Sequence, residues 1–275
     1  MGVLDDKVAI VTGSARGIGR ATAELLSEHG AKVLINDLDA DIAEQTASEI
    51  AGDTVVYGGD LTKGDAPDQL VQTAIDAWGK IDIIVNNAGY TLDGPVHKLS
   101  DDWWQRMLDI HVTVPFKVIR AAAPHLREPA KAEKAEGREV FRKIVNISST
   151  SGTMGNAGQA NYSAGKSAVV GLTKTVAKEW GQFKVNVNAV AFGFIDTRLT
   201  QSKTDENTME VDGQTVQLGI PDQMRGMASM LIPLGRPASP EEAAGGVFFL
   251  CSPWSNYVHG QVLNVTGGVF SGMTT

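Results

Sequence analysis

Short runs of apolar residues alternate with longer stretches of helical periodicity along the whole chain. The apolar runs are rich in β-branched residues, and they show no polar alternation. This is typical of strands covered on both faces. We expect strands at 7–11, 32–36, 54–57, 81–85, 143–147, 185–190 and 262–265. Helices are predicted at 18–29, 40–50, 64–78, from an N-cap at Ser100 to about 110, after Pro115, and at 162–180 and 240–250.

About seven strands that take turns with helices predict one fold class. Parallel strands need helical crossovers, and helices on both faces bury both sides of the sheet. We therefore expect an α/β fold, a Rossmann-like, doubly wound parallel sheet. No Pro-, Gly- or Ser-rich linker divides the chain, and no internal repeat is present. Residues 1–275 are predicted to form a single domain.

Two segments interrupt this alternation. Residues 125–143 carry many charges of both signs, and we interpret them as a charged insertion, a solvated helical extension with i,i+4 pairs. Residues 197–234 form the longest connection, and a long connection in a compact domain is often a lid. This predicted substrate lid contains Met209, Met224, Met227 and Met230. Methionine adapts to irregular apolar shapes, so an apolar substrate cover and ordinary packing are both open readings.

Composition excludes several classes of function. The chain has 24 Lys and Arg against 32 Asp and Glu, a formal charge of −8, and it contains no long basic run. Nucleic acid and an anionic membrane surface are therefore poor candidates as partners. Cys251 is the only cysteine, which favours a reducing, cytoplasmic compartment. The sequence contains no secretory signal and no apolar run long enough for a membrane helix.

A glycine-rich turn follows the first predicted strand. Gly13, Gly17 and Gly19 in T-G-S-A-R-G-I-G allow a tight turn, so that backbone N–H groups at a helix start can approach a pyrophosphate. Asp37 ends the second strand, eighteen residues after Gly19. A carboxylate there accepts both adenosine ribose hydroxyls and repels a 2′-phosphate, so we expect NAD rather than NADP. Arg16 favours the opposite choice, and a helix-capping role for Asp37 is the structural alternative.

Tyr162 and Lys166 suggest acid–base chemistry. Residues four apart on a helix share one face. A fixed ammonium beside a phenol favours the phenolate, so we expect Lys166 to lower the pKa of Tyr162 toward the working pH. The alternative is a Tyr–Lys surface pair without function. No His, Cys or acidic cluster has metal-site spacing, and we predict no catalytic metal.

Together these motifs resemble the classical short-chain dehydrogenase/reductase family, over nearly the whole chain. The matching segments are T-G-S-A-R-G-I-G at 12–19, Asp60-Leu61, N-N-A-G at 86–89, I-S-S at 147–149 and Y-S-A-G-K at 162–166. The resemblance implies catalytic Ser149, Tyr162 and Lys166, and it suggests a homotetramer. The residues expected to bind the cofactor are Gly13, Arg16, Gly17, Ile18, Gly19, Asp37, Asp60, Leu61, Asn87, Ala88, Gly89, Tyr162, Lys166, Ile195 and Thr197.

Within the family, three stretches look most like 3-oxoacyl-acyl-carrier-protein reductases: 153–162, 193–197 and 260–268. We therefore expect hydride transfer between a nicotinamide cofactor and a secondary alcohol or ketone, with an acyl-CoA or acyl-carrier-protein thioester as the best substrate. A hydroxysteroid or other cyclic alcohol dehydrogenase is the alternative with the same chemistry. A catalytically idle NAD-binding scaffold is the alternative of another class.

The chain departs from the family pattern at two positions. His111 stands where the family usually has an asparagine that holds a water beside the catalytic lysine. We hypothesise that His111, which ordinarily titrates near pH 6.5, substitutes in this proton relay; a relay without this side chain is the alternative. Phe192 replaces the proline of the usual A-P-G turn. It either narrows the pocket near the nicotinamide or packs in the core.

Overall fold

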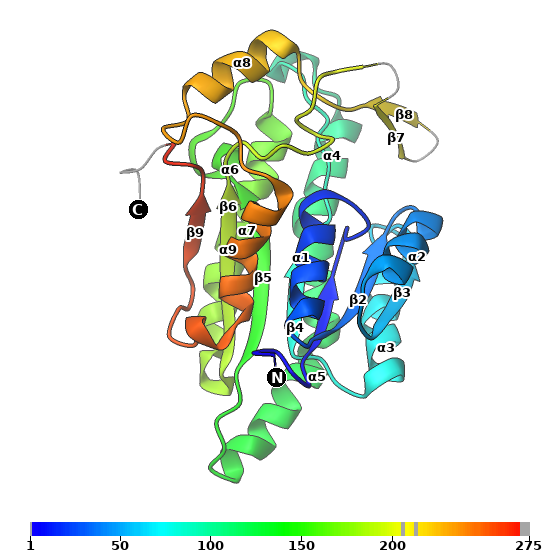
Figure 1. Ribbon diagram of the computed structural model, residues 1–275, viewed down its shortest axis with the longest axis vertical. Coiled ribbons are helices and arrows are strands. Elements are labelled where there is room, and N and C mark those ends of the chain that lie inside the picture. The colour runs from blue at the N-terminus through cyan, green and yellow to red at the C-terminus, as the bar shows by residue number, and fades with distance from the viewer. Residues whose placement is uncertain (1, 205–206, 212–213, 270–275) are drawn as a thin grey trace.

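Seven parallel strands form the central sheet of the protein (Figure 1). The computed structural model describes residues 2–204, 207–211 and 214–269. The strand order is β3-β2-β1-β4-β5-β6-β9. The strands are β1 (Val8–Val11), β2 (Lys32–Asp37), β3 (Thr54–Gly58), β4 (Ile83–Asn86), β5 (Arg142–Ser149), β6 (Val185–Phe192) and β9 (Val262–Val265). The doubly wound parallel sheet predicted from the alternation is therefore confirmed, with all seven strands at the expected places.

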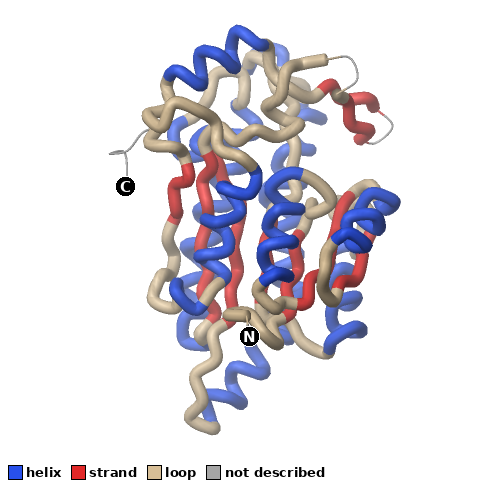
Figure 2. The backbone as a smooth tube through the Cα atoms, in the orientation of Figure 1, coloured by secondary structure: helices blue, strands red, loops and turns tan. Residues whose placement is uncertain are grey.

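Helices cover both faces of this sheet (Figure 2). They are α1 (Gly17–Glu28), α2 (Ala40–Glu49), α3 (Ala66–Trp78), α4 (Asp101–Leu108), α5 (Val114–Ala135), α6 (Thr150–Met154), α7 (Ala160–Trp180), α8 (Asp222–Met230) and α9 (Pro240–Cys251). Short helical turns occupy Val96–Lys98, Gly181–Phe183 and Pro253–Ser255. The predicted N-cap is present, since the Ser100 side chain accepts a hydrogen bond from the backbone N–H of Trp103.

The two predicted helices around Pro115 are joined by a π-helical turn, η2 (Asp109–Thr113). The chain therefore stays helical from α4 to α5. A π-helical turn inserts an extra residue into the helical repeat and is common at functional sites. Here it carries His111 into the interior, where only 2% of the residue is exposed.

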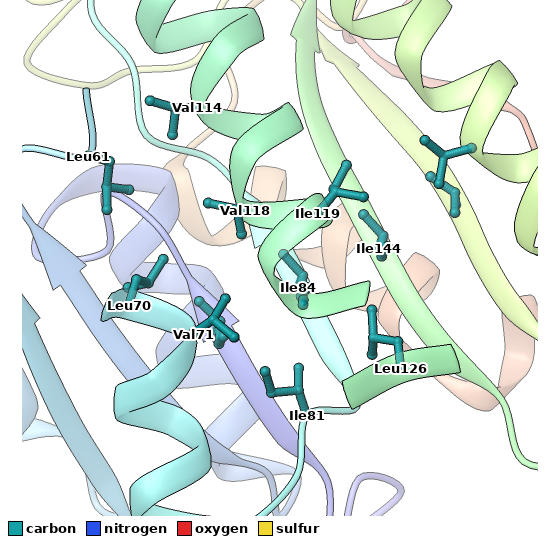
Figure 3. Close-up of a cluster of buried hydrophobic side chains, with 14 of the residues drawn as sticks. Leu61, Leu70, Val71, Ile81, Ile84, Val114, Val118, Ile119, Leu126 and Ile144 are labelled. Carbon is teal, nitrogen blue, oxygen red and sulfur yellow. The ribbon is translucent and has the colours of Figure 1, made fainter. Parts of the chain in front are cut away.

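The core has two layers, because successive residues of a strand point to opposite faces. Ile10, Ile84 and Ile144 pack with α3, α5 and α7 in one cluster (Figure 3). Their neighbours Val11, Val85 and Val145 pack with α1 and α9 in the other. Truncating one of these buried isoleucines to alanine typically costs about 2–5 kcal/mol of stability. Both faces are anchored in this way, so the carboxyl edge of the sheet is a rigid platform for loops.

The charged insertion at 125–143 differs from the prediction in part. Most of it is the end of α5, as expected for a helical extension. However, Arg142 and Glu133 form a two-pronged ion pair, with both nitrogen–oxygen distances 2.8 Å and side chains only 7% and 12% exposed. The segment is therefore not only a solvated face: its last residues join the sheet as β5.

The predicted lid contains a hairpin that the sequence reading missed. Strands β7 (Thr208–Val211) and β8 (Gln214–Gln217) pair in antiparallel fashion, apart from the main sheet. The sequence did hold a signal, because an Asp-Gly dipeptide between two β-rich runs is typical of a two-residue hairpin loop. That dipeptide, 212–213, lies outside the described residues.

Candidate active site

The glycine turn is tied to the N-N-A-G segment at the centre of the sheet. The Thr12 hydroxyl accepts hydrogen bonds from the backbone N–H groups of Asn87 and Ala88, both at 3.0 Å. The Asn87 side chain donates to the carbonyls of Thr12 and Gly13 at 3.0 and 2.9 Å. A Cβ at Gly13 would lie 2.7 Å from the Ala88 Cα, and Gly13 has a φ of +62°. Only glycine fits this close approach, so the turn is locked between β1 and β4.

The start of α1 offers unpaired backbone donors to an anion. Arg16 is its N-cap residue, and no side chain caps the helix there. Gly17 is in the left-handed region, with a φ of +55°. The strand order reverses between β1 and β4, which is where a doubly wound sheet binds a dinucleotide. Gly13, Gly17, Ile18 and Gly19 therefore fit a pyrophosphate held by the first turn of α1.

Asp37 lies at the end of β2, beside this turn. Its carboxylate accepts a hydrogen bond from the Ala15 N–H at 3.2 Å. Burial raises the pKa of Asp37, while hydrogen bonds from Asp39 and Ala15 and the charge of Arg16 lower it. The helix-capping role belongs instead to Asp39, which accepts from the Ile42 N–H at 3.3 Å. Asp37 therefore does not cap α2; its two carboxylate oxygens accept instead from the backbone N–H groups of Ala15 and Asp39.

Asp60 and Leu61 follow β3 on the same edge of the sheet. One Asp60 carboxylate oxygen accepts hydrogen bonds from the backbone N–H and the hydroxyl of Thr62, at 2.8 and 2.7 Å. Leu61 is buried in the core cluster of α3 and α5. The loop after β3 is therefore fixed in place, and its contact with an adenine ring stays a prediction.

Ser149, Tyr162 and Lys166 come together at the carboxyl end of β5. The Lys166 amine donates to the Ile147 carbonyl at 2.7 Å and lies 5.6 Å from the centre of the Tyr162 ring. The Ser149 hydroxyl is hydrogen-bonded to the phenol of Tyr162. Asn161 fixes the start of α7: its side chain donates to the Leu92 carbonyl at 3.0 Å and accepts from the Tyr162 N–H at 2.8 Å. The three predicted catalytic side chains therefore share one small site.

The pKa values in this site differ from the prediction. Burial raises the pKa of Tyr162 to about 12, although the hydrogen bond from Ser149 opposes this effect. Burial lowers the pKa of Lys166 to about 7. The expected lowering of the Tyr162 pKa by Lys166 is therefore wrong for the protein alone, because desolvation of both groups outweighs their proximity.

His111 lies against Tyr162. The two ring centres are 5.0 Å apart and the rings meet edge to face. Its Nε2 lies 2.8 Å from the Tyr90 carbonyl, whereas its Nδ1 is buried with no partner among the described residues. Burial and the charge of Lys166 lower the pKa of His111 well below 6.5. The expectation that it titrates near its ordinary value is therefore wrong, and the ring stays neutral near pH 7.

The turn after β6 brings Ile195 and Thr197 to the same edge. Ile195 is buried, and the Thr197 methyl group would lie 3.8 Å from a Cβ placed at Gly17. Thr197 thus lies next to the phosphate turn. Phe192 is 5% exposed and packs with the α1–α9 core cluster, so it fills the core and does not narrow the pocket.

The predicted lid contains the hairpin β7–β8 and the helix α8, and their methionines differ in burial. Met209 of β7 packs against the core cluster of α3 and α5, while Met230 at the end of α8 is 87% exposed. The side chains of Met224 and Met227 lie outside the described part of the structure. Of the two described methionine side chains, one packs in the core and the other is exposed, so the choice between an apolar substrate cover and ordinary packing stays a prediction.

No group of three or more His, Cys, Asp or Glu side chains among the described residues is placed to hold a metal ion. No helix in the same residues is long and apolar enough to cross a membrane.

Comparisons with known proteins agree with this arrangement. The family profile described as enoyl-(acyl carrier protein) reductase matches residues 13–270. The 3-oxoacyl-(acyl-carrier-protein) reductase of Synechocystis sp. is 38% identical over 98% of this chain and 99% of its own length. The FabG reductases of Vibrio cholerae and Thermotoga maritima, which carry the same name, are 37% and 34% identical over 97% of this chain and 98% of theirs. The chain therefore belongs to the short-chain dehydrogenase/reductase family of nicotinamide-dependent oxidoreductases.

Proposed function

We propose that this protein reduces a 3-oxoacyl thioester to the 3-hydroxyacyl thioester, or runs the reverse oxidation, with NAD as its preferred cofactor. The observation that carries the proposal is the hydrogen bond between the Ser149 and Tyr162 hydroxyls, with the Lys166 amine 5.6 Å from the centre of the Tyr162 ring. Two hydroxyls that converge on one point suit a substrate with a single carbonyl or alcohol oxygen.

Each catalytic side chain has a distinct role in this proposal. When bound, the nicotinamide supplies the hydride for the carbonyl carbon in reduction and accepts it in oxidation. Tyr162 donates its phenolic proton to the carbonyl oxygen, and in oxidation it takes the proton back. Ser149 donates a hydrogen bond to the same oxygen and stabilises the negative charge that develops on it. Lys166, held by the Ile147 carbonyl, supports the proton transfer of Tyr162 and would hold the nicotinamide ribose of a bound cofactor.

Asp37 supports the choice of NAD. Its carboxylate is not used as a helix cap, and one of its oxygens is held by the Ala15 N–H. It therefore accepts the adenosine ribose hydroxyls and disfavours a 2′-phosphate. Arg16, the residue that could favour NADP, is paired with Asp39 at 3.2 Å, which reduces its attraction for a phosphate.

The names of the relatives support the substrate class. Relatives that match over nearly their full length are named 3-oxoacyl-(acyl-carrier-protein) reductases. The carrier of the thioester in this protein is either an acyl-carrier protein or coenzyme A. Four copies of the chain form the active enzyme, and the large aromatic side chains exposed on α4 and α5, Trp104 and Phe116, suit such contacts. Light scattering should give four times the 29.2 kDa chain mass.

His111 contributes to the proton relay through its Nδ1, which has no hydrogen-bond partner among the described residues. Because Nε2 faces the Tyr90 carbonyl, it carries the proton, and Nδ1 is left as a buried acceptor beside Lys166 and Tyr162. A water bonded to Nδ1 continues a proton path from the catalytic lysine. The pH–rate profiles of wild type and His111→Asn test this role, and superimposable profiles would remove it.

The main experiment measures initial rates with acetoacetyl-CoA, comparing NADH with NADPH. Wild type should turn over faster with NADH, and Tyr162→Phe should lower kcat by about 100-fold or more. Tyr257→Phe is the matched control, because it also removes a phenolic hydroxyl but at a fully exposed surface position. No turnover in wild type, with NADH still bound, would redirect the search to cyclic alcohols or to a non-catalytic NAD-binding role.

A further inference from the structure

Arg198 lies close to the glycine turn that is expected to bind the cofactor. It directly follows Thr197, whose methyl group faces Gly17 of the phosphate turn. The Arg198 side chain is half-buried, and its Nη2 donates to the Thr208 carbonyl at 2.8 Å. Asn207 holds the same residue from the other side, since its side-chain amide donates to the Arg198 carbonyl at 2.8 Å. The Arg198 guanidinium is therefore held in place by the start of strand β7.

The hairpin that holds Arg198 belongs to the adenosine half of the site. Its cross-strand pair, Met209 and Val216, packs against the core cluster that contains Leu61. Figure 1 shows β7 and β8 on the side of β2, β3 and α2, whereas α8 lies on the side of β6 and β9. The hairpin therefore lies toward the strands β2 and β3, on the side where an adenosine would be bound.

Arg198 lies among charged side chains of the turns that follow β1 and β2. Burial lowers its pKa, the nearby guanidinium of Arg16 lowers it further, and Asp37 and Asp39 raise it. Arg198 therefore lies near Arg16, Asp37 and Asp39. Asp39 is already paired with Arg16. A guanidinium has five N–H donors in a planar fork that matches a phosphate, and the contacts to Thr208 and Asn207 do not use all of them.

We propose that Arg198 binds a phosphate of the cofactor's adenosine half and that the hairpin β7–β8 positions it there. The inference rests on the proposed function only for the identity of the cofactor. It adds a residue that neither the glycine turn nor the family motifs predict. It also gives the hairpin a task in cofactor binding, separate from any cover over the substrate.

The test is direct binding without substrate, using Arg198→Met and Arg198→Lys. NADH affinity is measured from nucleotide fluorescence, and ADP-ribose and adenosine are measured by displacement of NADH. Arg198→Met should raise the Kd for NADH and ADP-ribose about tenfold, because one charged hydrogen-bond partner is lost. Arg198→Lys should recover part of this loss, and adenosine, which has no phosphate, should bind equally to all three proteins.

NADPH separates the two phosphates that Arg198 could bind. If Arg198→Met loses the same affinity for NADPH and for NADH, Arg198 binds the pyrophosphate. A clearly larger loss for NADPH assigns it to the 2′-phosphate. The matched control is Arg236→Met, which removes an exposed arginine that follows the lid and is paired with Glu242 of α9. This control should leave every Kd unchanged.

Two results would overturn the inference. One is an unchanged Kd for NADH, ADP-ribose and NADPH in Arg198→Met. The other is an equal loss for adenosine, which would mean that the substitution disturbs the site as a whole. The conservative Arg198→Lys variant keeps the test valid if Arg198→Met folds poorly. If wild type itself binds no nicotinamide cofactor, the proposed function fails, and that outcome is distinct from a failure of Arg198 alone.

Discussion

Two buried lysines lie at opposite ends of β5 and differ in how they are bonded. Lys143, near the start of the strand, donates to Asn186, Ser255 and Asn256, with distances of 3.0, 3.3 and 2.8 Å. Lys166, beside the strand end, has one acceptor among the described residues, the Ile147 carbonyl. Burial lowers both pKa values, to about 8 for Lys143 and about 7 for Lys166.

A shifted pKa alone therefore does not mark an active site in this protein. The Lys143 ammonium has three protons and three acceptors, so its donors are fully used in joining β5 to β6 and the turn at Pro253–Ser255. Lys166 keeps donors for a substrate, a cofactor or a water. The useful distinction is unused hydrogen-bonding capacity next to another reactive group, here Tyr162.

The substitution Lys166→Met should show the largest effect on catalysis. We expect kcat to fall about 100- to 1000-fold, because Tyr162 loses the group that supports its proton transfer. The free energy of unfolding should change by less than about 1 kcal/mol, since the lost hydrogen bond is offset by the removal of a buried amine. Steady-state rates and urea unfolding check both parts, and an unchanged kcat would refute the catalytic role.

The substitution Lys143→Met should show the opposite pattern. Three polar groups lose their partner in the interior, so the free energy of unfolding should fall by about 2–4 kcal/mol. The kcat of the folded protein should stay at the wild-type value, because Lys143 lies at the other edge of the sheet. Urea unfolding and rates at low temperature measure the two quantities. A loss of kcat in the folded variant would show that the two ends of β5 are coupled.

The two lysines also predict a pH dependence of stability. In the unfolded chain a lysine keeps its proton up to about pH 10.4, whereas the folded pKa values are about 7 and about 8. Between pH 7 and 9 the unfolded state thus binds more protons, and stability should rise with pH, by at most about 1.4 kcal/mol per pH unit for each lysine.

Urea unfolding at several pH values measures this slope, with Lys143→Met as the comparison. The slope should be smaller in the variant. The measured pH range should end near pH 9. Burial raises the pKa of Cys251 from about 9 to about 12, so above pH 9 the unfolded chain loses the thiol proton first and the contribution of Cys251 to stability falls with pH. Identical slopes in both proteins would contradict the lowered pKa of Lys143.

The smallest predicted effect concerns Asp93, near the catalytic tyrosine. The pKa of Tyr162 is raised mainly by burial, and the charge of Asp93 raises it further. Asp93→Asn keeps an acceptor for the hydrogen bond from Gln159, which is 2.9 Å long. The basic limb of the pH–rate profile should move to lower pH in this variant. A shift to higher pH, or none, would show that Asp93 does not act on Tyr162.

The sequence predicted the sheet well because its signals are local. Every strand is a short apolar run, and burial on both faces makes such runs continuous. The glycine turn was equally clear, since the φ of Gly13 and its contact with Ala88 admit no side chain. The spacing of Tyr162 and Lys166 on one helix was enough to bring them together on one face.

The pKa values of the site depend on how deeply each side chain is buried, and the sequence alone does not show this burial. The pKa of Tyr162 rises where proximity to Lys166 suggested a fall, and His111 is neutral where its ordinary pKa suggested titration. Both errors come from desolvation, which is set by residues distant along the chain. Arg198 was missed for a similar reason, because its neighbours Arg16 and Asp37 come from other parts of the sequence.

The sequence by itself determined the order of strands and helices, the glycine turn after β1 and the shared helix face of Tyr162 and Lys166, because each depends on residues close together along the chain. Only the tertiary structure decided which buried lysine has free donors, where the hairpin β7–β8 lies, and which charged groups lose their water. Those properties are sums over contacts between distant segments, and they exist only once the sheet has brought these segments together.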